Sequence, residues 1–139
     1  MSRLSELPCD PKGLNSLALA FVGDGVYDLI IREELVCRGN RPVKQLNIEK
    51  VEIVRCQAQA ALAEKIEPYL TEEEADVMRR GRNAHVNHAP KNATMGEYHA
   101  ATAFEALLGY LYLSDRIDRI MELLSLTDNP DTYIISSKS

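Results

Sequence analysis

The chain has 139 residues, of which 45% are hydrophobic and 27% are charged, and its formal net charge is −5. This length favours a single domain, and the composition is typical of a globular protein rather than a disordered one. The acidic balance argues against a general nucleic-acid binder, although it does not exclude a local basic patch.

Cysteine usage and hydropathy exclude further classes of protein. Cys9, Cys37 and Cys56 are odd in number and widely spaced, so they suggest neither a disulfide framework nor a metal-ligand pairing. The N-terminal segment lacks the apolar core of a signal peptide, and no run approaches the roughly 20 apolar residues of a membrane span. We therefore expect a cytoplasmic protein with no membrane association.

Apolar residues recur at helical spacing along most of the chain, and no segment shows convincing β alternation. The spacing predicts helices over residues 14–38, 43–66, 72–80, 97–114 and 115–126, the last as a separate helix or a bent continuation. Gly39 and Asn40 form a typical stop after the first helix, and Thr71 with three following glutamates predicts a capping box. The fold class is all-α. The predicted organisation is a lead-in over 1–13, one domain over 14–127 and a loosely ordered tail over 128–139.

The segment Gly23-Asp24-Gly25 allows three interpretations. Asp-Gly is a common hairpin signal, but the flanks have helical rather than alternating period. A phosphate-binding loop would need a preceding strand and a longer glycine pattern. We therefore expect a position inside a helix, where each glycine costs on the order of 1 kcal/mol relative to alanine. The close approach of another backbone would explain this cost.

Two carboxylates are predicted on the inner faces of long helices. Asp24 borders the apolar stripe of the first helix, with Asp28 one turn further on the same side, and Glu105 borders the stripe of the fourth. An unpaired carboxylate in an apolar interior is costly, so a shared cation such as Mg²⁺ would explain the pair. Alternatively, the two acids form ion pairs with arginines such as Arg32, Arg55 or Arg116, or are partly solvated.

Residues 77–96 carry positive charge and no Asp or Glu, against the net charge of the chain. Arginine and amide side chains suit phosphate and ribose contacts, and the lack of aromatic residues favours duplex RNA over a stacked single strand. The candidate RNA-binding residues are Arg79, Arg80, Arg82, Asn83, Lys91 and Asn92. The alternative is a solvated loop that balances the acidic run at 72–76. The sequence does not assign a role to His85, His88 or His99.

Three motifs resemble those of a known family. The stretch "LALAFVGDGVYDL" is similar to the signature helix of ribonuclease III catalytic domains, and "ATAFEALLGYLYL" is similar to their second acidic helix. Between them, "RRGRNAHVNHAPKNAT" resembles the loop of the mini-ribonuclease III group, whose members lack an appended double-stranded-RNA-binding domain. The resemblance covers about residues 12–126.

The resemblance implies an α-helical homodimer that cleaves double-stranded RNA with Mg²⁺, for which Mn²⁺ can substitute, and leaves 5′-phosphate products. Asp24 and Glu105 match the catalytic metal ligands of the family, and the family's role implies maturation of precursor ribosomal RNA of the 23S type. Leu17, Ala20 and Thr102 stand where larger relatives carry acids. Water should therefore fill more of the ion's coordination shell, with Asp28 and Thr102 as candidates to hold it. The alternative function is a non-catalytic helical dimer that binds structured RNA.

Overall fold

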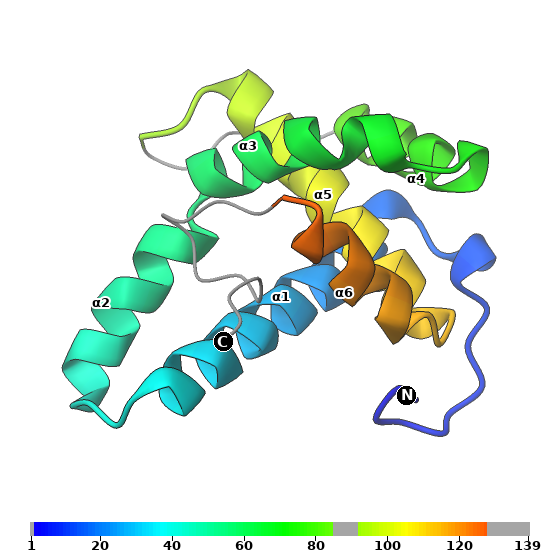
Figure 1. Cartoon of the computed structure of the whole chain (residues 1–139). Helices are drawn as coiled ribbons and strands as arrows, with labels where there is room; N and C mark the ends of the chain where they lie inside the picture. The colour runs from blue at the N-terminus through cyan, green and yellow to red at the C-terminus, as the bar shows by residue number, and fades with distance from the viewer. Residues whose placement is uncertain (1, 85–91, 128–139) are drawn as a thin grey trace.

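The computed structural model describes residues 2–84 and 92–127, and its regular structure is helical throughout this part (Figure 1). The predicted tail at 128–139 lies outside the described residues, as do Met1 and residues 85–91. Two short 3-10 turns occur at Pro11–Gly13 and Glu67–Tyr69. The helices are α1 (Ser16–Arg38), α2 (Val43–Val54), α3 (Cys56–Ile66), α4 (Glu72–Arg82), α5 (Met95–Leu113) and α6 (Ile117–Ser125). The prediction of an all-α fold is confirmed.

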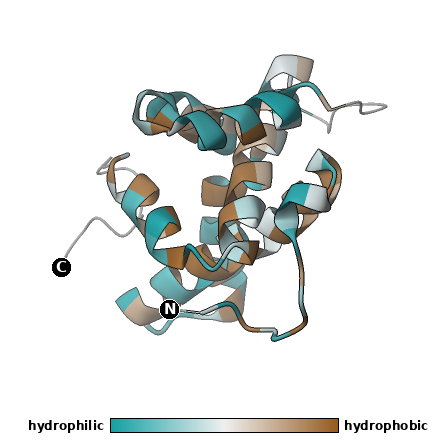
Figure 2. Cartoon of the chain, turned by 90° about the vertical axis from the view of Figure 1, so that its right-hand side faces the viewer, coloured by the Kyte–Doolittle hydropathy of each residue, from teal (hydrophilic) through white to brown (hydrophobic). Residues whose placement is uncertain are grey.

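Helix α5 is the centre of the bundle. It contacts α1, α3, α4 and α6, and Figure 1 shows α3 and α4 above it and α1 below. Because it is surrounded, most of its residues from Ala101 to Leu111 are buried, including Phe104, Leu107 and Leu108 at 0% exposure. Figure 2 shows hydrophobic residues gathered toward the middle of the bundle. Within the described residues, no helix is long and apolar enough to cross a membrane.

Side-chain caps begin three of these helices. Asn15 accepts a hydrogen bond from the backbone of Ala18 at the start of α1. At α4, Thr71 and Glu74 form the capping box that the sequence predicts. A second capping box, formed by Thr94 and Glu97, starts α5 two residues earlier than the apolar spacing alone indicates.

The single helix expected over residues 43–66 is wrong, because the chain breaks it at Arg55. This residue is extended, with φ −64° and ψ 160°, and separates α2 from α3. The two halves pack on different partners, since α2 lies against α1 whereas α3 lies against α5. No glycine or proline marks this break, so tertiary packing rather than local propensity determines it.

Helices α1 and α5 cross in backbone contact at two glycines. A Cβ atom added to Gly23 would lie 1.7 Å from the carbonyl oxygen of Glu105, and one added to Gly109 would lie 1.9 Å from that of Leu19. The expected close backbone approach is thus found at Gly23. It is not found at Gly25, where an added Cβ atom meets nothing within 4 Å.

Candidate active site

The glycine crossing brings the two predicted carboxylates together. Asp24 follows Gly23 on α1, and Glu105 is the α5 residue whose backbone Gly23 approaches. The side chains are close enough to interact directly, and Glu105 is half-buried. Asp24 is exposed, so the expectation that it faces the interior is wrong. The pair therefore opens to solvent on one side, as a site for a dissolved ion and a large substrate must.

Glu105 titrates far from its ordinary range. Burial, with the charge of Asp24 and a hydrogen bond shared with it, raises the pKa of Glu105 from 4.5 to about 8. The side chain of Gln59 hydrogen-bonds the carboxylate and acts in the opposite direction. Two adjacent carboxylates repel each other when both are ionised. The pair of Asp24 and Glu105 therefore either retains a proton or requires a cation.

The arginine partners considered from the sequence are engaged elsewhere. Arg32 lies 2.5 Å from Asp28, Arg55 pairs with Glu52, and Arg116 pairs with Glu73. Among the residues that the structure describes, no lysine or arginine forms a salt bridge with Asp24 or Glu105. The interpretation of the pair as a simple ion pair with an arginine is therefore wrong.

A buried amide adjoins the pair, and sequence reasoning missed it. Gln59 on α3 is 3% exposed, and its Nε2 donates to the carbonyl oxygen of Val54 at 2.7 Å. Its Oε1 is buried and accepts no hydrogen bond from the part of the chain that the structure describes. A buried acceptor without a donor costs about 1–3 kcal/mol, so an additional donor at this point would be stabilising. The only indication in the sequence is a polar residue within an otherwise apolar stripe.

These groups suit a hydrated Mg²⁺ ion better than a fully protein-coordinated metal. Within residues 2–84 and 92–127, no group of three or more His, Cys, Asp or Glu side chains could hold a metal. Mg²⁺ commonly uses one or two carboxylates and keeps several waters. Asp24 and Glu105 would supply the carboxylates, and Gln59 Oε1, which has no partner among the described residues, would supply an acceptor for a water proton.

Asp28 and Thr102, which the sequence suggests as holders of water around the ion, already have partners within the protein. Burial acts to raise the pKa of Asp28, but hydrogen bonds from Arg32 and Lys50 outweigh it and lower that pKa. Asp28 is therefore neutralised by two cations. Thr102 is 4% exposed, and its hydroxyl donates to the carbonyl oxygen of Tyr98 at 2.9 Å. The hydroxyl of Thr102 can therefore still accept a hydrogen bond, but it has no second proton to donate.

The predicted basic residues project from the end of α4. Arg79 and Arg80 both pair with Asp76, and Arg82 lies 3.8 Å from the exposed Glu67. Two guanidinium groups share one carboxylate, so the cluster keeps a net positive charge, and exposed pairs of this kind are weak. The surface therefore remains able to bind phosphate.

The loop after α4 is described only in part. Asn83 is exposed at the end of α4, and the exposed Asn92 has a φ of 65°. The carbonyl oxygen of Asn92 accepts a hydrogen bond from the Gln57 side chain on α3. Lys91, with His85 and His88, lies outside the described residues.

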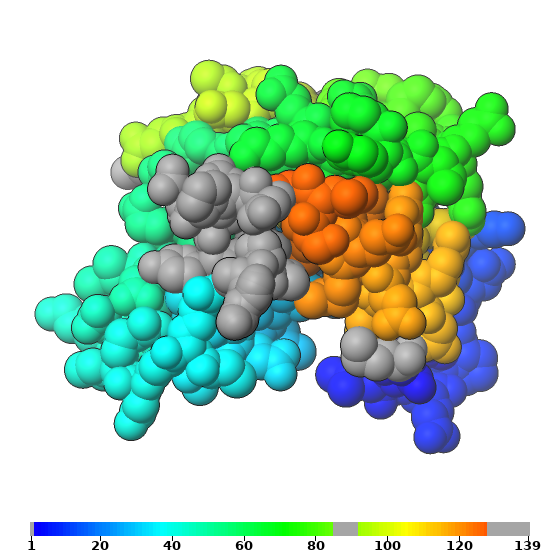
Figure 3. Space-filling view, in the orientation of Figure 1, coloured from blue at the N-terminus to red at the C-terminus, as the bar shows by residue number. Residues whose placement is uncertain are grey.

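The basic cluster and the carboxylates occupy different sides of α5. Gly81 of α4 packs on Ala103, which lies about 200° around the helix from Glu105. In the space-filling view, α4 covers the top of the molecule above α6 (Figure 3). A ligand that contacts both groups must therefore be large compared with the width of one helix.

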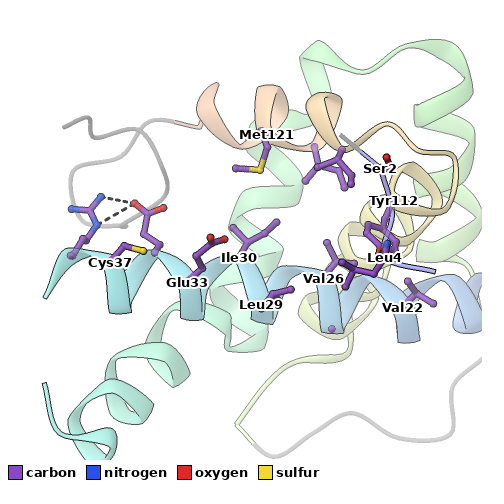
Figure 4. Close-up of a pocket in the computed structure, with 15 residues that line it drawn as sticks. Ser2, Leu4, Val22, Val26, Leu29, Ile30, Glu33, Cys37, Tyr112 and Met121 are labelled. Carbon is purple, nitrogen blue, oxygen red and sulfur yellow. Dashed lines mark hydrogen bonds and ion pairs between the residues drawn. The ribbon is translucent and has the colours of Figure 1, made fainter. Parts of the chain in front are cut away.

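An apolar groove of about 840 Å³ is the other marked surface feature. Figure 4 shows Val26 and Ile30 of α1 facing Met121 of α6 across it, with Leu4 of the N-terminal segment at one end. Neither Asp24 nor Glu105 lines this groove. Most of its lining is apolar, although Glu33, Glu34 and Arg38 also line it, and it resembles a surface for packing.

Comparisons with known proteins identify the family of the chain. The Ribonuclease III domain model matches residues 17–116. A Mini-ribonuclease 3 from Thermoanaerobacter sp. is 46% identical over 114 residues, covering 82% of this chain and 80% of that protein. A Mini-ribonuclease 3 from Gloeobacter violaceus is 45% identical over 132 residues, covering 88% and 96%.

The fold also matches a solved structure. A protein from Fusobacterium nucleatum, known from its crystal structure, superposes with a TM-score of 0.78 at 28% identity. The match covers 86% of this chain and 96% of that one. The catalytic-domain signature, the fold and the relatives coincide over the segment that contains both carboxylates, and the chain belongs to the mini-ribonuclease III group of the ribonuclease III family.

Proposed function

We propose that the protein is an endoribonuclease that hydrolyses double-stranded RNA, with Mg²⁺ or Mn²⁺ held by Asp24 and Glu105. The observation that carries this proposal is the carboxylate pair at the α1–α5 crossing, which has no basic partner among the described residues. Family membership supports the reaction class.

The chain's own residues would bind the cation and orient it toward the scissile phosphate. Glu105 is held rigidly, because its backbone is locked against Gly23, whereas Asp24 faces solvent. A bound divalent ion would activate water for attack and stabilise the negative charge that develops on the phosphate. The products would be a 5′-phosphate and a 3′-hydroxyl.

The basic cluster of Arg79, Arg80 and Arg82 would bind the phosphate backbone of the duplex, together with Asn83, Lys91 and Asn92. Cationic and amide side chains contact phosphate and ribose without reading sequence, and duplex RNA is recognised mainly in this way. The separation of this cluster from the carboxylates suits an extended ligand rather than a nucleotide.

Cleavage of both strands would require a homodimer, because each copy supplies one carboxylate pair. Helix α1 exposes Phe21 at 84%, one turn before Asp24, and Leu17 at 45% and Leu29 at 56%. Exposed apolar surface of this kind marks an interaction site, and a two-fold axis would pair the same patch on each copy. A second copy seated there would bring two carboxylate pairs onto one substrate.

For the biological substrate, we propose precursor ribosomal RNA of the 23S type, following the family's role. Such a substrate would require the enzyme to act in the cytoplasm. The competing function is a dimer that binds structured RNA without cleaving it. The apolar residues at positions 17 and 20, where larger relatives carry acids, are the reason to test it.

Duplex RNA cleavage with Mg²⁺ or Mn²⁺ tests the proposal directly. Wild type should cleave a long duplex, and Asp24→Asn and Glu105→Gln should each lose about 100-fold or more in rate, because loss of a group that only supports a metal ligand already costs about 10- to 100-fold. Asp118→Asn, at an exposed residue of α6, is the matched control and should retain full activity. Binding without cleavage by wild type would instead support the non-catalytic dimer, and full activity of both site variants would rule out the proposed site.

A further inference from the structure

Gln59 is a buried polar side chain whose contacts link the α2–α3 break to the carboxylate pair. It is 3% exposed on α3, and its Nε2 donates to the carbonyl oxygen of Val54, the last residue of α2. That carbonyl fixes the orientation of the amide, because the flipped arrangement would set two acceptor oxygens against each other. The Nε2 group thus faces Val54, and Oε1 faces elsewhere.

The amide has one further donor and one further acceptor to satisfy. Its side chain also interacts with the Glu105 carboxylate, and because an ionised carboxylate only accepts hydrogen bonds, the group of Gln59 that faces it is an N–H. Its Oε1 is buried and has no hydrogen-bond partner among residues 2–84 and 92–127. A buried acceptor that stays unsatisfied beside two carboxylates is costly, and water bound to a cation is the donor that such carboxylates would bring to it.

We infer that Gln59 is a positioning residue for the divalent cation: its amide nitrogen orients Glu105, and its Oε1 accepts a hydrogen bond from a water of the hydrated ion. The inference rests on the proposed metal site at Asp24 and Glu105. With only two carboxylates, the orientation of the ion's remaining waters depends on neutral groups of this kind, and losing such a group typically weakens metal affinity about 10- to 100-fold.

The test measures binding of Mn²⁺ alone, by electron paramagnetic resonance without RNA. Gln59→Met preserves the volume and unbranched shape of the side chain but removes both polar atoms. We expect it to weaken Mn²⁺ binding about 10- to 100-fold. In the cleavage assay, the Mg²⁺ concentration for half-maximal rate should rise, while the rate at saturating Mg²⁺ recovers.

Two controls separate positioning from folding. Gln45→Met makes the same change at an exposed residue of α2 and should not alter Mn²⁺ affinity. Leu62→Ala removes a buried side chain from α3 and should lower the melting temperature without changing Mn²⁺ affinity. Mn²⁺ affinity in Gln59→Met within about twofold of wild type would overturn the inference.

A measurement on the wild-type protein covers the case in which Gln59→Met does not fold. On titration with Mg²⁺, the side-chain NH₂ resonances of Gln59 should shift, whereas those of Gln45 should not. An unchanged Gln59 signal at Mg²⁺ saturation would contradict the inference. If Asp24→Asn abolishes Mn²⁺ binding but Gln59→Met does not, the inference alone fails. If wild type binds no Mn²⁺, both the inference and the proposed metal site are wrong.

Discussion

Glu74 and Glu105 have pKa values that are shifted in opposite directions, because their surroundings differ. Glu74 is 1% exposed, and hydrogen bonds from Arg119, both at 2.8 Å, lower its pKa. Glu105 is less buried, yet its own burial and the charge of Asp24 beside it raise its pKa. A carboxylate that is paired with an arginine in the interior stabilises the fold, whereas one that is opposed by another carboxylate is a candidate for binding a ligand.

The Glu74–Arg119 pair should dominate the acid sensitivity of the fold. Because the pKa of Glu74 is lowered in the folded state, its contribution is complete above the ordinary value of 4.5 and is lost as the pH falls through the lower folded pKa. Arg119→Met would leave a buried unpaired carboxylate, costing about 3–5 kcal/mol at pH 7. The cost should shrink toward pH 4, where Glu74 in the variant becomes protonated. Urea denaturation at the two pH values measures this difference.

A matched change at a more exposed pair provides the control for that prediction. Arg116 lies 3.0 Å from Glu73, and both side chains are about two-fifths exposed, at 39% and 44%. Arg116→Met should therefore cost only about 0.2–1 kcal/mol. Equal losses from the two arginine variants would show that burial does not determine the strength of these pairs.

At the scale of helices, α1 depends on two glycines with different roles. Gly23→Ala would drive a methyl group into the Glu105 carbonyl, so we expect a loss of at least about 3 kcal/mol. Gly25→Ala, two residues along the same helix, meets nothing within 4 Å and should gain up to about 1 kcal/mol from helix propensity. Thermal denaturation of the two variants tests this. A stable Gly23→Ala protein would contradict the backbone contact.

Helix α4 should contribute to RNA affinity through charge alone. Arg79→Ala and Arg80→Ala should each weaken binding of any duplex and reduce the slope of log K against log salt by about one. Binding would be measured in the Asp24→Asn background, so that the RNA stays intact. Lys44→Ala, at an exposed residue of α2, should leave the slope unchanged. Unchanged slopes for both arginine variants would identify α4 as a solvated surface.

Periodicity predicted most of the helices, but it could not predict what their packing determines. The apolar stripes locate α1, α5 and α6 within a few residues, because burial on one face produces that spacing, and the capping box locates α4. The break at Arg55 carries no local signal, since it arises where α2 and α3 turn to different partners. The same limit applies to the site: the sequence indicated Asp24 and Glu105, whereas Gln59 joins them only through tertiary structure.

At the scale of the whole molecule, the exposed apolar face of α1 is the strongest indication of assembly. Phe21→Ser should convert the proposed dimer to a monomer in light scattering, because two buried phenylalanines would be lost per dimer. At about 1.5–3 kcal/mol each, this would weaken dimerisation at least about 100-fold. Tyr69→Ser, at 51% exposure after α3, should leave the mass unchanged. A Phe21→Ser protein that remained dimeric would place the interface elsewhere.

The glycine crossing also limits how this enzyme could be re-engineered. The separation between the Asp24 and Glu105 backbones is set by a contact that admits no Cβ atom. Adapting the pair to a larger ion such as Ca²⁺ by moving the helices apart would require dismantling the centre of the core. Changes in metal preference must therefore come from side chains around the crossing. Ala20 and Thr102, which precede Gly23 and Glu105 by three residues on α1 and α5, are the positions at which to begin.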